Sequence, residues 1–66
     1  MKNRLKVERA ILDITQDELA QRIGVSRQTI NSIEKGRYVP STVLALKLSE
    51  VFEKNVNDFF TLEDSD

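Results

Sequence analysis

The segment from Thr15 to Lys35, TQDELAQRIGVSRQTINSIEK, constrains the fold of this chain more than any other part. Thr15 and Glu18 match a capping box, in which the hydroxyl and the carboxylate each accept a hydrogen bond from the other residue's backbone amide. Six residues later Gly24 can end a helix in the left-handed conformation that is strained for other residues. The pattern predicts a short helix that begins at residue 16 and stops at a tight turn.

A second short helix is expected directly after this turn. Ser26 is a good N-cap, and Gly36 offers another left-handed stop, so the helix should run from Arg27 to about residue 35. At helical spacing Ile30 and Ile33 face inward and leave polar side chains on the outer face. Two short helices at a fixed angle with a polar outer face are typical of a unit that places one helix in the major groove of DNA.

Apolar residues at helical spacing predict further helices on both sides of this pair. The first should span residues 4 to 12, with Lys6, Glu8 and Asp13 facing outward. The fourth should begin after Ser41, which is a good N-cap, and carry a wide apolar face as far as Phe52.

The end of the chain is expected to hold one more short turn. Asn55 can end the fourth helix in the left-handed conformation, and Asn57 can cap a last turn that carries Phe59 and Phe60. This gives five helices in one domain of 66 residues, with the helix-turn-helix unit at residues 16–35.

Composition narrows the possible functions. The chain has no cysteine and no histidine, which removes disulfides, nucleophilic thiols and the commonest zinc ligands. It also lacks a pair of carboxylates in a plausible pocket, so we expect neither an enzyme nor a metal or other cofactor. No secretion signal and no apolar run of about 18 residues is present, so we expect a soluble, cytoplasmic protein without membrane contact.

The formal charge of −1 conceals an uneven distribution. Residues 1–57 carry ten basic and seven acidic side chains, whereas the last nine residues carry four acidic side chains and no basic one. Between residues 22 and 37, in the proposed DNA-facing stretch, the basic residues Arg22, Arg27, Lys35 and Arg37 are opposed only by Glu34. This local basic patch is compatible with binding to nucleic acid.

The motif TQDELAQRIGVSRQTINSIEKGRYVPS, followed by a hydrophobic fourth helix, resembles the Cro and phage-repressor helix-turn-helix family, often called the XRE family. The resemblance covers residues 5–60. It implies an all-α, compact, five-helix lambda-repressor-like DNA-binding domain that binds operators as a homodimer. In some very small relatives the chain termini form a small sheet, so a short two-stranded sheet is a further possibility.

The resemblance, together with the position and chemistry of the exposed side chains, predicts roles for individual residues. Base edges are expected to be read from the outer face of the second helix of the unit, by Arg27, Gln28, Asn31 and Ser32. Phosphates are expected to meet the start of the first helix and the loop after the second, through Thr15, Gln16, Thr29, Lys35, Arg37 and Tyr38. Arg9 and Glu34 stand where many relatives have a structural ion pair. Tyr38 has an alternative role as a lid on the core, and Thr29 an alternative role in helix packing. Asn31 and Ser32 are short enough to contact a base, a phosphate or only water.

The C-terminal segment 57–66 is an expected dimerisation segment with an acidic tail. The candidate dimer contacts are apolar: Val51, Val56, Phe59, Phe60 and Leu62. Phe59, Phe60 and Leu62 have two alternatives to a dimer contact. They could complete the core of the monomer, or belong to a short strand paired with residues 1–4.

One position departs from the family pattern. Glu8 stands where a bulky apolar residue is frequent, and we expect Val7 to fill that volume. The sequence as a whole predicts a homodimeric transcriptional regulator and favours repression over activation. The expected partner is a double-stranded DNA operator, and no small-molecule effector is expected. The alternative is a protein-interaction module, such as an antitoxin-like or accessory subunit, that uses the same fold.

Overall fold

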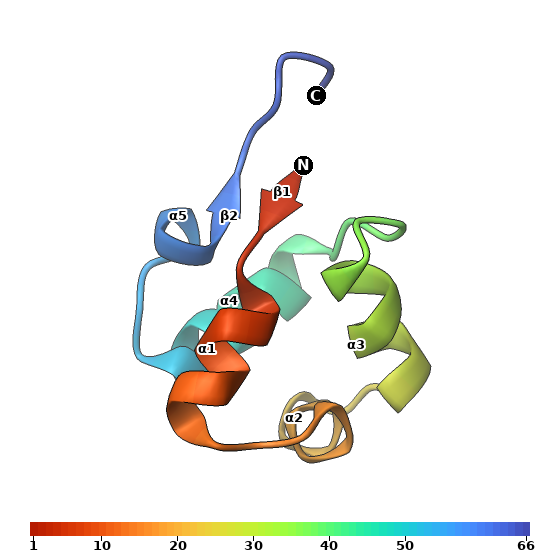
Figure 1. The fold of residues 1–66 in the computed structure, drawn as a ribbon, viewed down its shortest axis with the longest axis vertical. Coiled ribbons are helices and arrows are strands. Elements are labelled where there is room, and N and C mark those ends of the chain that lie inside the picture. Colours follow the sequence, from red (N-terminus) through yellow and green to blue (C-terminus); the bar gives the residue numbers. More distant parts are fainter.

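The computed structural model describes residues 1–66 as five helices and one small sheet (Figure 1). The elements in chain order are β1 (Lys2–Asn3), α1 (Leu5–Leu12), α2 (Gln16–Ile23), α3 (Arg27–Glu34), α4 (Thr42–Phe52), α5 (Val56–Phe59) and β2 (Phe60–Thr61). The predicted fold class, five helices with a small terminal sheet, is confirmed. None of the helices is long and apolar enough to cross a membrane.

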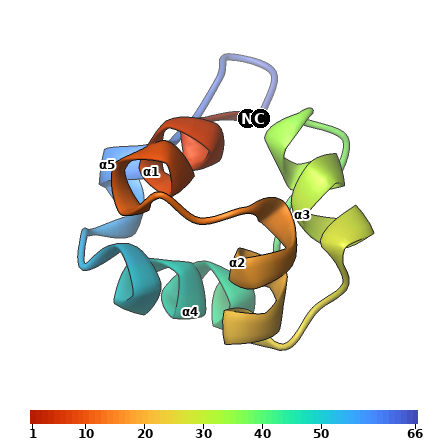
Figure 2. The same ribbon diagram turned by 60° about the horizontal axis from the view of Figure 1, so that its bottom comes forward.

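The helices surround a single core of twelve buried apolar residues. Its members come from α1 to α5 and from the segments beside them: Leu5, Ile14, Leu19, Ala20, Ile23, Ile30, Ile33, Leu44, Leu48, Phe52, Phe59 and Phe60. Figures 1 and 2 show α3 on one side of this core and α5 on the other. α3 and α5 therefore lie on opposite sides of the domain.

The predicted helix limits around the turn are confirmed. The Glu18 amide donates to Thr15 Oγ1 at 3.0 Å, and the Thr15 amide donates to Glu18 Oε1 at 3.1 Å, which completes the capping box. Gly24 and Gly36 have φ values of 74° and 73°, in the left-handed region that glycine tolerates. Ser26 Oγ accepts from the Thr29 amide at 3.2 Å and starts α3.

The two chain termini lie side by side in an antiparallel pair of strands. Lys2 pairs with Thr61, and Asn3 pairs with Phe60. The Asn3 side chain also donates from Nδ2 to the carbonyl of Ile33 at 2.7 Å. The sheet is therefore joined to the last turn of α3, where carbonyl groups lack partners inside the helix.

The expected orientation of α1 is wrong at two positions. Glu8 points into the protein and is only 3% exposed, whereas Val7 is exposed and does not fill its volume. Glu8 lies three residues after Leu5, so the two side chains share the inner face of the helix. Lys54 Nζ lies 2.7 Å from Glu8 Oε1, which compensates the buried charge.

The expected chain path after α4 is also wrong. Glu53, not Asn55, takes the left-handed conformation at the end of α4, with φ of 54°. Asn55 is instead the N-cap of α5, and its amide donates to Asp58 Oδ2 at 3.1 Å. Asn57 lies inside α5 and does not cap it. The short helix therefore begins two residues earlier than expected.

Phe59 and Phe60 belong to the core of the protomer. Phe59 is 1% exposed, and its ring meets Phe52 edge-on, with centroids 5.1 Å apart and an interplanar angle of 82°. Phe60 is 7% exposed and contacts Phe59 with centroids also 5.1 Å apart. Of the three alternatives for this segment, core packing and strand pairing both occur, because Phe60 also begins β2.

Candidate nucleic-acid interface

α2 and α3 pack against each other through small and branched apolar residues. Ala20, Ile23 and Ile30 are almost wholly buried, and the chain between the helices consists only of residues 24–26. A small residue at position 20 allows the helix axes to approach, and Gly24 turns the chain without strain. The pair thus forms a rigid bihelical unit whose second helix has one face free.

The free face of α3 carries the four side chains that were expected to read bases. Arg27 and Gln28 are exposed, whereas Asn31 and Ser32 are half-buried. A polar hollow of about 190 Å³ lies where the two helices meet, lined by Gln16, Arg27, Gln28 and Asn31. The structure thus brings three of the expected base readers to one hollow, while Ser32 lies on the side of α3 that faces Tyr38.

The start of α2 forms a second polar hollow, of about 690 Å³, which shares Gln16 and Arg27 with the first. The first amides of a helix have no partner inside it. Thr15 satisfies the amide of Glu18, so those of Gln16 and Asp17 remain free donors. Free amides and the positive end of the helix dipole favour an anion at this place.

Two carboxylates in the first turn of α2 are held by side chains or amides of the same helix end. Asp17 accepts from Gln21 Nε2 at 3.3 Å. Glu18 accepts from the backbone amide of Thr15, and the hydrogen bonds from that amide and from the Thr15 hydroxyl keep the pKa of Glu18 below its ordinary value. Asp17 also lines the second hollow, so a phosphate bound there would lie beside a carboxylate that already accepts from Gln21.

Behind this hollow lies the ion pair between Arg9 and Glu34. Arg9 Nε donates to Glu34 Oε2 at 2.6 Å, and Arg9 Nη2 donates to Glu34 Oε1 at 3.0 Å. The third arm of the guanidinium donates to the carbonyl of Ile14 at 3.1 Å. Hydrogen bonds to Glu34 raise the pKa of Arg9 above its ordinary value. The pair links α1, the start of α2 and the end of α3.

Gln16 connects the ion pair to the reading face. Its Nε2 donates to Glu34 Oε1 at 3.2 Å and to Asn31 Oδ1 at 3.4 Å. These contacts were not anticipated from the sequence, because they join residues 15 to 18 positions apart whose long side chains have many rotamers. Both amide hydrogens of Gln16 are used within the protein, and its expected phosphate contact stays a prediction.

The loop after α3 presents the other expected phosphate contacts. Lys35, Arg37 and Tyr38 are exposed, and the exposure of Tyr38 removes its alternative role as a lid on the core. Thr29 is half-buried, and its hydroxyl lies 3.0 Å from Ser26 Oγ. Thr29 therefore supports the N-terminal turn of α3 and lies at its flank, with Tyr38 across a hollow of about 250 Å³.

The expected dimer contacts fall into two groups. Leu62 is 77% exposed, and Val51 and Val56 are half-buried, so all three have surface to offer. Phe59 is enclosed within the protomer and has none, which corrects its expected role in the dimer. An edge of Phe60 still lines an apolar groove of about 300 Å³, together with Met1, Val39, Pro40, Thr42, Ala45, Leu46 and Val56.

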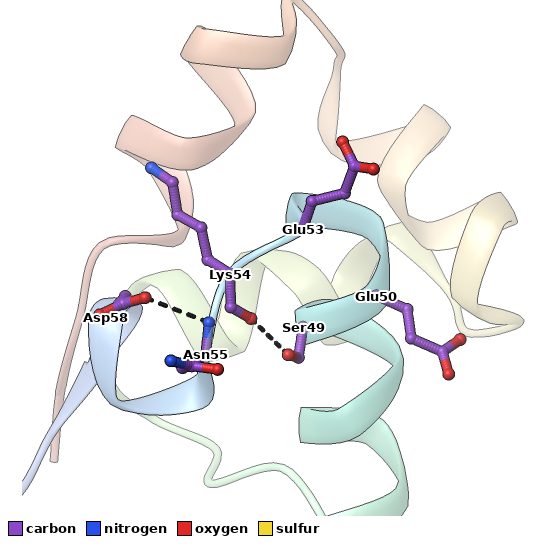
Figure 3. Close-up of a pocket in the computed structure, with 6 residues that line it drawn as sticks. All are labelled: Ser49, Glu50, Glu53, Lys54, Asn55 and Asp58. Atoms are coloured by element: carbon purple, nitrogen blue, oxygen red, sulfur yellow. Dashed lines mark hydrogen bonds between the residues drawn. The ribbon is translucent and has the colours of Figure 1, made fainter.

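A further polar hollow, of about 430 Å³, lies at the end of α4 and is lined by Ser49, Glu50, Glu53, Lys54, Asn55 and Asp58 (Figure 3). Its carboxylates do not converge: Figure 3 shows Glu50 and Glu53 pointing away from Asp58, while Lys54 extends toward α1. Ser49 Oγ donates to the Lys54 carbonyl and closes the chain after the helix. The hollow therefore results from the way the chain turns at the end of α4.

The geometry defines a class of protein: a bihelical unit with a polar second helix and an anion-binding helix start is a helix-turn-helix domain. A family model described as Helix-turn-helix matches residues 5–59. The chain belongs to the XRE-type helix-turn-helix family.

Relatives with similar sequences extend over the whole domain. The HTH-type transcriptional regulator MJ0272 of Methanocaldococcus jannaschii is 50% identical over 66 residues, which is 100% of both chains. The HTH-type transcriptional regulator YgzD of Bacillus subtilis is 47% identical over 64 residues, 97% of each chain. An HTH-type transcriptional regulator of Archaeoglobus fulgidus is 44% identical over 66 residues, 100% of this chain and 93% of the relative.

Proposed function

We propose that this protein is a transcriptional regulator that binds a specific double-stranded DNA sequence as a homodimer. The observation that carries the proposal is the outer face of α3, where exposed Arg27 and Gln28 lie beside the free amides at the start of α2. A major groove admits one α-helix, and a helix start beside it binds the flanking phosphate. The family membership and the names of the relatives support the same function.

Base edges are read by the side chains at the start and middle of α3. Arg27 donates twice to guanine O6 and N7, and Gln28 pairs in two directions with adenine N6 and N7. No side chain of the protein forms a hydrogen bond with either of them, so both are free to adapt to a base pair. Asn31 and Ser32 add shorter contacts from the half-buried part of the same face.

Phosphates on both sides of the reading helix fix its register. On one side the free amides of Gln16 and Asp17 bind the backbone, with the Thr15 hydroxyl beside them. On the other side Lys35, Arg37 and Tyr38 follow the helix into the exposed loop, with Thr29 at the flank. These contacts contribute affinity and orientation without sequence information.

The homodimer is formed through the apolar surface on the C-terminal side of the domain. The surface consists of residues that line the 300 Å³ groove, namely Val39, Leu46, Val56 and the edge of Phe60. Half-buried Val51 and exposed Leu62 are proposed to extend it. One short reading helix makes few base contacts, so two half-sites are needed for useful specificity. A two-fold symmetric dimer then requires a near-palindromic operator.

Repression is the proposed direction of regulation, because a bound dimer can block a promoter without an additional domain or partner. The experiment that tests the proposal is selection of bound fragments from a pool of random duplexes, followed by measurement of the chains bound per duplex. We expect two inverted half-sites with centres about 34 to 36 Å apart and two chains per duplex.

The double variant Arg27→Ala/Gln28→Ala is the matched control for this selection, because both side chains are exposed and their loss leaves the fold intact. It should recover no motif while remaining folded. A wild-type selection without an enriched motif would overturn the proposed function, and a single unpaired half-site would overturn the homodimer.

A further inference from the structure

The orientation of one reading side chain is set by a chain of hydrogen bonds that starts at the buried ion pair. An amide side chain can present either its oxygen or its nitrogen, and the choice follows from its neighbours. Both carboxylate oxygens of Glu34 accept from nitrogens of Arg9, so Glu34 offers only acceptor atoms to its other neighbours. The side chain of Glu34 is only 8% exposed, and the guanidinium holds it in place.

Gln16 is the next member of the chain. Because Glu34 Oε1 is an acceptor, the Gln16 atom 3.2 Å away must be the nitrogen Nε2. The second hydrogen of Nε2 is directed to Asn31, at 3.4 Å. Both hydrogens are then used within the protein, and only the oxygen of Gln16 faces outward.

Asn31 is the last member. The atom that receives the Gln16 hydrogen must be an acceptor, so Asn31 Oδ1 points toward Gln16 and Nδ2 points away from it. No protein atom accepts from Asn31 Nδ2. Asn31 lines the 190 Å³ hollow of the reading face together with Arg27 and Gln28. It therefore offers two hydrogen-bond donors to a base.

We propose that Arg9, Glu34 and Gln16 act as positioning residues that make Asn31 a donor-only reader, selective for guanine over adenine. This inference rests on the proposed function. Adenine is recognised by an amide through both its oxygen and its nitrogen, whereas the major-groove edge of guanine presents two acceptors, O6 and N7. Because Oδ1 is bonded to Gln16, Asn31 cannot pair with adenine through both its oxygen and its nitrogen. It can still donate to the acceptors of guanine. Gln28 has no such restraint and can still pair with adenine through both its oxygen and its nitrogen.

The decisive variant is Gln16→Ala, which removes the donor that occupies Asn31 Oδ1 and leaves the ion pair untouched. The base pair read by Asn31 is identified first, as the position at which Asn31→Ala loses its preference. At that base pair the wild type should prefer guanine. Gln16→Ala should shift the guanine-to-adenine affinity ratio toward adenine by about tenfold, the size of one bidentate contact, and leave the Gln28 position unchanged.

Gln21→Ala is the matched control. Gln21 is an exposed glutamine on the same helix whose side chain bonds only to Asp17. It should leave all base preferences unchanged. Adenine as the wild-type preference at the Asn31 position would overturn the inference, and so would a guanine preference that survives Gln16→Ala. In both cases the wild type still selects an operator, so the proposed function stands.

A second readout needs no DNA. In the free protein the side-chain amide protons of Gln16 should exchange with solvent several-fold more slowly than those of Gln21. The variant Glu34→Gln, which offers Gln16 a neutral partner and halves the acceptor capacity, should remove that difference if it folds. Equal exchange rates for Gln16 and Gln21 in the wild type would overturn the inference whatever the DNA result.

Discussion

Lys54, just beyond α4, and Glu8 on α1 form an ion pair with 2.7 Å between Nζ and Oε1, and the carboxylate end is almost fully buried. A buried carboxylate costs free energy unless a partner compensates it, and Lys54 is the compensating partner. The pair also joins the first helix to the segment before α5. It therefore explains how an acidic side chain is accommodated on the inner face of α1.

Replacing Lys54 by Met should lower the free energy of unfolding by about 2 kcal/mol, because it leaves the Glu8 charge buried without a partner. The expected loss of unfolding free energy is smaller than for a fully buried pair because Lys54 itself is partly exposed. The double variant Glu8→Leu/Lys54→Met should return to within about 1 kcal/mol of the wild type or exceed it. Urea unfolding measures both, and a double variant less stable than Lys54→Met alone contradicts this account.

Replacing Arg9 by Met should lower the free energy of unfolding by about 3 kcal/mol, because Glu34 then keeps a largely buried charge. For a domain of this size that corresponds to a fall in melting temperature of roughly 4 to 8 °C per kcal/mol. Gln28→Ala is the control, and should stay within about 0.5 kcal/mol of the wild type because its side chain is exposed. Equal melting temperatures for Arg9→Met and the wild type are the contrary result.

Gln28 and Arg37 should differ in how their loss affects DNA binding. Gln28→Ala should relax the preference at one base pair per half-site, at a cost of about 1 to 3 kcal/mol in discrimination. Arg37→Ala should weaken binding to all sequences alike. It should also reduce the slope of log affinity against log salt concentration by about one per lost phosphate contact. Binding isotherms on single-substitution operators separate the two. If Arg37→Ala alters the preference at one base pair, the assigned roles are wrong.

The capping box should make stability depend on pH. Hydrogen bonds from Thr15 favour the ionised form of Glu18, so its pKa is lower in the folded than in the unfolded chain, where the ordinary value is 4.5. The resulting stability is present above pH 4.5 and is lost as the pH falls through the folded pKa. Glu18→Gln retains an acceptor oxygen but does not titrate.

The measurement is the difference in unfolding free energy between wild type and Glu18→Gln from pH 7 to pH 3. The other carboxylates titrate in both proteins, so their effect cancels in the difference. The advantage of the wild type should shrink as the pH falls. A difference that stays constant over this range shows that the Glu18 carboxylate has no role in capping.

The proposed dimer surface predicts different effects for two exposed apolar residues. Leu62→Asp should weaken dimerisation by about tenfold or more, because burial of a leucine is worth about 1.5 to 3 kcal/mol. Ile11→Asp is the matched control, since Ile11 is 61% exposed on α1, outside the proposed surface. Sedimentation over a range of concentrations gives both dissociation constants. An effect of Ile11→Asp as large as that of Leu62→Asp places the contact elsewhere.

The helix-turn-helix unit could be predicted from the sequence because its signals are local. Thr15 with Glu18, Gly24, and Ser26 each fix the backbone within three or four residues, and the structure has all of them where the sequence places them. The helical period then determines which side of α3 Ile30 and Ile33 occupy. The exposure of Arg27 and Gln28 follows from the same period.

The parts that could not be predicted depend on partners distant in the sequence. Glu8 is turned inward by a lysine 46 positions later, and no local signal reveals that contact. Asn55 and Asn57 are both good caps, so the local signals do not decide where α5 begins. Apolar composition cannot say whether Phe59 is covered by its own chain or by another. The hydrogen bonds of Gln16 depend on side-chain rotamers that no spacing encodes.

The most direct test of the central claim is a titration of labelled operator DNA, and of a scrambled duplex of equal length, at increasing salt concentrations. The account predicts a preference for the operator that persists as salt rises, while the affinity for both duplexes falls steeply through release of phosphate counterions. Equal affinity for the two duplexes at every salt concentration, or no binding to either, would contradict the claim that the outer face of α3 reads DNA.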